Sequence, residues 1–169
     1  MISKLNTTDR FFFSKVNRES RGVLEYAGVD VSELRLIVWE CTSISTLEYA
    51  WNNTKWGKKS QSGKVIDQAW FCAGVAATNK LEFLKWAREV KQCDWDEKTI
   101  TVAASIRGNL EMLKYCFSNG CPCDEEKSCE QAAIDGHLDC VRFLFDQVEP
   151  SREAEEEAAY QVACHGHLD

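Results

Sequence analysis

Residues 136–139 read Gly-His-Leu-Asp, and this four-residue motif recurs along the chain. Each copy has a small or turn-forming residue, a variable residue, a Leu and then an acid. The copies stand at 79–82 (Asn-Lys-Leu-Glu), 108–111 (Gly-Asn-Leu-Glu), 136–139 and 166–169 (Gly-His-Leu-Asp), at intervals of 29, 28 and 30 residues, with a weaker copy at 45–48. A near-constant period of this size is typical of a repeat array.

The sequence around the motif repeats as well. Residues 93–118 align with residues 121–146 without a gap, so that Cys93 falls on Cys121. An apolar stripe at spacing i, i+3, i+7 follows each turn and indicates the buried face of a helix. The stripe consists of Leu110, Leu113 and Phe117 in one repeat and Leu138, Val141 and Phe145 in the next. Each repeat is therefore predicted to be a short Ala-rich helix, a tight turn, a bulkier helix and a loop.

These repeats resemble the ankyrin repeat family. The small pair at 132–133 precedes Gly136 and His137, as an Ala-Ala pair precedes Gly-His in ankyrin repeats, and an apolar second helix follows. No repeat has the Thr-Pro-Leu-His stretch, and the period is below the usual ~33 residues. The closest resemblance is therefore to the short-loop ankyrin repeats of algal, oomycete and giant-virus proteins, over roughly residues 34–169. It implies an all-α, ankyrin-like α-solenoid of four to five helix-turn-helix repeats.

The predicted array covers residues 31–169. Its repeats are expected at about 31–56, 65–92, 93–120, 121–148 and 151–169, with a helix over 31–42 in the first and caps at Asp96 or Thr99 and at Asp124. The last repeat stops before its second helix. Because an array that ends in this way leaves an apolar face open, we expect a truncated product, a fragment of a longer array or a covering partner.

Residues 1–30 differ from the array and are predicted to form a tail followed by a capping helix. Residues 1–9 are expected to be a loose tail, and residues 10–28 a helix with Phe12, Phe13 and Val16 on one apolar face. Residues 16–21 resemble the second half of an F-box, although the Leu-Pro start of that motif is absent. This resemblance implies an alternative role, the recruitment of substrates to a ubiquitin ligase.

Charge and composition disfavour a nucleic-acid-binding, membrane-spanning or secreted protein. The formal net charge is −7, and residues 120–169 hold 13 acidic against three basic residues. Such an acidic half disfavours nucleic acid and favours a protein partner with a basic or mixed surface. No stretch approaches the roughly 18 apolar residues that cross a membrane, and no secretory signal is present. The nine cysteines are therefore expected to be reduced, in a cytoplasmic or nuclear protein that is a monomer or part of a longer array.

Three arrangements contain residue types that carry chemistry. Residues 121–129 include three cysteines and residues 164–167 read Cys-His-Gly-His, but Cys-x-Cys differs from the usual zinc-ligand spacing. A disulfide across that short spacing would be strained. Cys140 lies near His137, yet one helix start supplies no oxyanion-stabilising feature. We expect no metal, cofactor or catalysis, with a zinc-dependent or redox-regulated protein as a further alternative.

The sequence therefore predicts a non-catalytic protein-interaction module or scaffold. The ankyrin resemblance implies that the residues just before each turn face the partner, together with the loop tips. These candidates are Ala77, Thr78, Ile106, Arg107, Ile134, Asp135, Cys164 and His165 before the turns, and Asp94, Trp95, Pro122 and Cys123 in the loops. Trp95 either seals the core or anchors the partner. The polar loop at 56–64 is either a binding finger or a longer connection.

Overall fold

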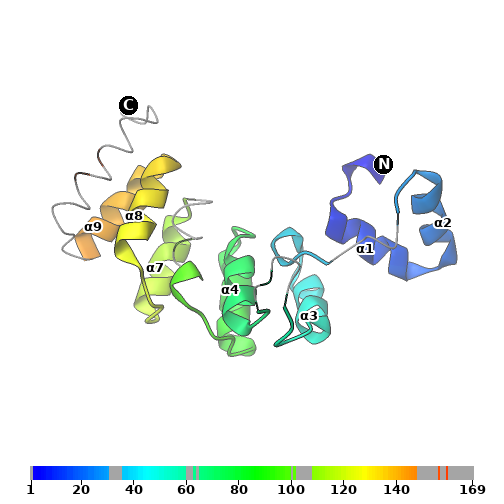
Figure 1. Cartoon of the computed structure of the whole chain (residues 1–169), viewed down its shortest axis with the longest axis horizontal. Coiled ribbons are helices and arrows are strands. Elements are labelled where there is room, and N and C mark those ends of the chain that lie inside the picture. Colours follow the sequence, from blue (N-terminus) through cyan, green and yellow to red (C-terminus); the bar gives the residue numbers. More distant parts are fainter. Residues whose placement is uncertain are drawn as a thin grey trace. The chain divides into compact units, whose positions relative to one another are not determined.

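A computed structural model of the chain describes residues 2–30, 36–59, 63, 65–99, 101, 108–147, 156 and 159 (Figure 1). Every regular element in these residues is a helix, apart from an isolated antiparallel bridge between Lys59 and Val65, so the predicted all-α class is confirmed. The chain divides into two compact units, Met1–Thr54 and Lys55–Asp169. Within the described ranges, no helix has the length and apolar character needed to cross a membrane.

The first unit contains η1 (Ile2–Lys4), α1 (Thr7–Val16), α2 (Arg18–Tyr26), η2 (Val38–Glu40) and α3 (Ile44–Asn53). The expected helix over 10–28 is wrong, because it breaks at Asn17. The backbone of Asn17 is extended, and its Oδ1 accepts the Ser20 N–H at 2.8 Å, which starts a new helix. As a result Val16 is 68% exposed. The loose tail is also wrong after Asn6, where α1 begins.

Thr8 determines the conformation of the segment that precedes α3. Its side chain is fully buried, and its Oγ1 accepts the Ile37 N–H at 3.0 Å and donates to the Ile37 carbonyl at 3.1 Å. The Thr8 N–H donates to the Glu40 carboxylate at 2.9 Å. These bonds hold Ile37 in an extended conformation. The helix predicted over 31–42 is therefore wrong in its described part, which holds only the short η2, and residues 31–35 lie outside the described residues.

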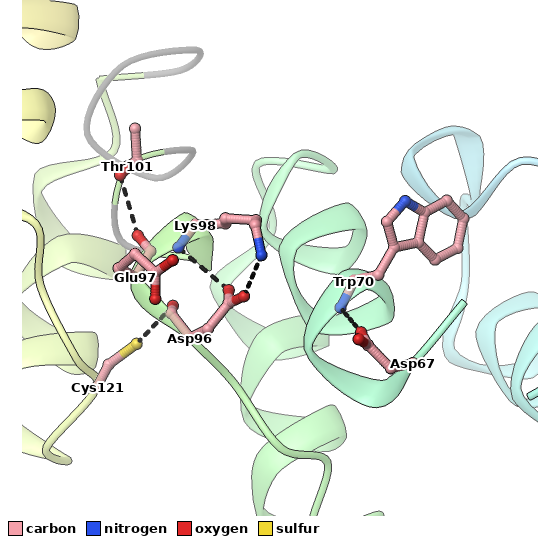
Figure 2. Close-up of polar contacts among 7 residues, drawn as sticks. All are labelled: Asp67, Trp70, Asp96, Glu97, Lys98, Thr101 and Cys121. Carbon is pink, nitrogen blue, oxygen red and sulfur yellow. Dashed lines mark hydrogen bonds and ion pairs between the residues drawn. The ribbon is translucent and has the colours of Figure 1, made fainter. Parts of the chain in front are cut away.

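The second unit contains α4 (Gln68–Ala76), α5 (Leu81–Lys85), the π-helical turn η3 (Trp86–Val90), α7 (Leu110–Ser118), α8 (Glu125–Ile134) and α9 (Leu138–Gln147). An Asp precedes each first helix of a repeat. Asp67 accepts the Trp70 N–H at 2.8 Å and Asp96 accepts the Lys98 N–H at 3.1 Å, as Figure 2 shows. Asp124 accepts the Lys127 N–H at 3.2 Å. The predicted caps at Asp96 and Asp124 are confirmed, and Asp67 caps the N-terminus of α4 in the same way.

The first residue of the repeated motif is left-handed in the three stronger copies that the structure describes. The weaker copy at 45–48 lies inside α3 instead. Asn79 has φ 62°, Gly108 φ 57° and Gly136 φ 77°. This conformation is strained for most side chains and is tolerated best by Gly and Asn. The motif therefore marks the tight turn between the two helices of a repeat, as predicted.

The second helices bury a different face from the predicted stripe. They bury the third, fourth and seventh positions counted from the motif Leu, which are Phe83, Leu84, Ala87, Met112, Leu113, Cys116, Cys140, Val141 and Leu144. In α7 and α9, only Leu113 and Val141 belong to the predicted stripe, whose other members there are half-buried. α7 contacts both α5 and α9, the second helices of the neighbouring repeats.

One extra residue explains why the first interval is 29 rather than 28 residues. Cys93 follows Leu81 by 12 positions, whereas Cys121 follows Leu110 by 11. The difference is absorbed by η3, in which the Lys91 N–H bonds the carbonyl five residues back at 3.2 Å. In α7 the matching bond from Asn119 reaches four residues back, at 3.1 Å. A π-helical turn of this kind accommodates an inserted residue without ending the helix.

Removing the extra residue should therefore be tolerated. We expect deletion of Val90, which is 65% exposed, to convert η3 to α-helix and leave Cys93 in place. Deletion of the exposed Ser118 in α7 serves as the matched control, because it removes a residue from a regular helix and rotates Cys121 out of register. Thermal unfolding followed by circular dichroism should show a melting temperature near that of the parent for the Val90 deletion and a drop of about 5 °C or more for the control. Equal losses would contradict this explanation.

Candidate functional site

The turns of successive repeats contact each other. Asn109 Nδ2 donates to the side-chain oxygen of Asn79 at 2.7 Å and to its carbonyl at 3.3 Å. The His137 ring lies against Gly108 so closely that a Cβ on Gly108 would be 2.4 Å from His137 Nδ1. In both cases the residue after one left-handed position touches the left-handed residue of the preceding repeat. The turns thus form a continuous edge of the second unit.

The loops at the other end of the first helices are also tied to the preceding repeat. The Cys93 thiol donates to the Gln68 carbonyl at 3.1 Å. The Cys121 thiol donates to the Asp96 carbonyl at 3.5 Å, as Figure 2 shows. Each bond reaches back 25 residues to the start of a first helix. The alignment of Cys93 with Cys121 was visible in the sequence, but this shared hydrogen bond was not.

The described candidate residues lie in two rows. The turn row consists of Ala77, Thr78, Ile134 and Asp135, of which only Asp135 is exposed and the rest are half-buried. The loop row consists of Asp94, Trp95, Pro122 and Cys123, of which Asp94 and Pro122 are exposed. The rows stand at opposite ends of first helices of nine and ten residues, so they are separated by about 15 Å. Ile106, Arg107, Cys164 and His165 lie outside the described residues.

Trp95 is part of the packing between repeats. The Arg88 guanidinium carbon lies 4.0 Å from the centre of the Trp95 ring, and the Tyr115 ring meets it edge-on at 6.3 Å. Arg88 also donates to the Cys93 carbonyl. Burial, together with the hydrogen bond from the Tyr115 hydroxyl to Glu89, raises the pKa of Tyr115 to about 12. Packing therefore accounts for the position of Trp95, one of the two roles that the sequence left open.

The loop at 56–64 forms a ribbon where it is described. The Gly57 N–H donates to the Ile66 carbonyl and the Ile66 N–H to the Lys58 carbonyl, both at 2.8 Å. Beside the ribbon lies a hollow of about 430 Å³, lined by Trp56, Gly57, Ile66, Asp67, Gln68, Ala69 and Asp94. This hollow adjoins the loop row at Asp94. Sequence reasoning missed it because its walls come from three separate segments.

The described cysteines are mostly buried. Eight of them are free thiols, and all but the half-buried Cys123 are buried. Burial raises the pKa of Cys140 to about 11, and a hydrogen bond with Cys116 together with burial raises the pKa of Cys121. Because thiolates bind metals and act as nucleophiles, the raised pKa makes Cys121 and Cys140 poorer at both. Among the described residues, no group of three or more His, Cys, Asp or Glu is placed to hold a metal ion.

No protein-family model, curated protein or solved structure matches this chain. The ankyrin and F-box resemblances therefore stay predictions. In the structure, the F-box-like residues 16–21 span the break between α1 and α2 at Asn17. The case for function accordingly depends on the two rows and on the hollow beside them.

Thiol reactivity should follow this burial. Among the eight described cysteines, we expect iodoacetamide at pH 8 to modify Cys123 first, because Cys140 is 1% exposed and its raised pKa keeps it protonated at that pH. Peptide mass spectrometry over a time course would give the order. The same reaction in denaturing urea is the control, in which all cysteines should react at similar rates. Fast modification of native Cys121 or Cys140 would contradict the packing described here.

Proposed function

We propose that the second unit is an ankyrin-like α-solenoid that binds another protein across its first helices and carries out no catalysis. The contact between successive turns is the observation that supports this most. Asn109 contacts Asn79 and His137 contacts Gly108 at equivalent positions. Successive repeats therefore pack against each other through the same two turn positions. Stacked repeats of this kind produce extended binding surfaces.

The distribution of exposed groups favours a protein partner. The turn row and the loop row are about 15 Å apart, which is too far for one small ligand and suits a protein surface. Asp135 in the turn row and Asp94 in the loop row are exposed acids, and the capping residues Asp67 and Asp124 add two more along the loop edge. A partner with basic residues would be complementary to both rows, and its affinity should fall as salt rises.

Affinity capture from the native source, read by mass spectrometry, tests this proposal. The test variant combines Asp94→Arg and Asp135→Arg, one substitution in each row. The control variant combines Glu82→Arg and Glu111→Arg, two exposed positions in the second helices with the same change in charge. We expect partners captured by the parent and the control to bind the test variant at least about tenfold more weakly, because like charges would face each other.

Two outcomes would contradict the proposal. One is a partner that binds the test variant as tightly as the control, which would place binding elsewhere on the chain. The other is the absence of any saturable partner for the parent. Circular dichroism of each variant shows whether its helices are retained, so that lost binding is not mistaken for unfolding.

A further inference from the structure

The hollow beside the ribbon has one aromatic wall, formed by Trp56. The Trp56 ring packs on Phe71 at 5.8 Å between ring centres, and Phe71 is fully buried in the core of the second unit. Trp56 itself remains 38% exposed, so part of its side chain stays accessible beside the hollow. An indole face held in this way attracts cations, and guanidinium groups stack on it particularly well.

Two acidic residues, Asp67 and Asp94, also line the hollow. Asp67 precedes α4 and uses Oδ1 to accept the Trp70 N–H, as Figure 2 shows, while Asp94 comes from the following loop. Gln68 links the two sides, because its Oε1 accepts the Asp94 N–H at 3.0 Å. In the described part of the chain, neither carboxylate forms an ion pair, and the Lys98 ammonium is paired with Asp96 instead.

These groups suit an organic cation. A volume of about 430 Å³ is in the range of sites that take one side chain or a small ligand. A metal ion is not favoured, because the described residues hold no group of three or more suitable ligands. A flat aromatic face together with two carboxylates matches the planar guanidinium better than the compact ammonium of lysine.

We propose that this hollow binds an arginine side chain of a partner protein, between Trp56 and the carboxylates of Asp67 and Asp94. The inference rests on the proposed function, since the hollow adjoins the loop row. The hollow would give the proposed binding surface one specific contact in addition to its negative charge.

The test uses the full ¹⁵N-labelled chain and Nα-acetyl-arginine N-methylamide as the probe. We expect saturable shifts of the Trp56 indole N–H with a Kd of about 1 mM, the range for a ligand of this size. The citrulline analogue keeps the shape and lacks the charge, and it should bind at least about fivefold more weakly. Asp94→Asn should weaken arginine binding to a similar extent, because it removes the charge and keeps the backbone bond to Gln68. Asp135→Asn, in the turn row, is the matched control and should bind as the parent does.

Three results would overturn the proposal. They are no shift at the Trp56 indole, equal binding of arginine and citrulline, and unchanged binding by Asp94→Asn. Stronger binding of the lysine analogue would also contradict the choice of arginine. The proposed function is judged separately by the Asp94→Arg and Asp135→Arg capture experiment. Lost capture without probe binding would refute the hollow alone. Probe binding without any captured partner would refute the proposed function and leave only a guanidinium site.

Discussion

The close contact between the His137 ring and Gly108 is the constraint on which the second unit depends. It requires a residue without Cβ at position 108, and it requires that residue to be left-handed, which Gly allows. The corresponding contact one repeat earlier uses a hydrogen bond from Asn109 to Asn79. Two different side-chain chemistries thus hold the same geometry. That geometry sets how far each repeat is displaced from the last, and so where the loops and their acids lie.

Much of this architecture could be predicted from the sequence, because local signals and tertiary packing agree there. The motif marks the turns at Asn79, Gly108 and Gly136, and the caps at Asp96 and Asp124 follow from side chains bonding to nearby backbone. The error over residues 31–42 arose where a distant group competes with local preference. Thr8 draws Ile37 into an extended conformation from 29 residues away, and no periodicity in residues 31–42 could reveal that.

The candidate site was predictable to a smaller degree. The loop row was placed by alignment, and exposure of Asp94 and Pro122 agrees with a surface position. Trp95 was ambiguous because its neighbours Arg88 and Tyr115 come from two different second helices. The hollow was missed, although one signal was available: Asp67 stands 29 residues before Asp96, at the equivalent capping position. Asp67 and Trp56 line the same hollow because the ribbon brings Trp56 there, and composition identified the ribbon only as a loop.

Substitution of Gly108 tests the central contact most directly. Gly108→Ala and Gly120→Ala both place a Cβ on a left-handed backbone, at φ 57° and 70°, but nothing lies within 4 Å of that Cβ at Gly120. Urea unfolding should show a loss of about 1–2 kcal/mol for Gly120→Ala, the cost of the backbone conformation alone. Gly108→Ala should lose at least about 2 kcal/mol more, and His137→Ala should recover part of that difference in the double variant. Equal losses at the two glycines, with no recovery, would mean that the turns do not stack in this way.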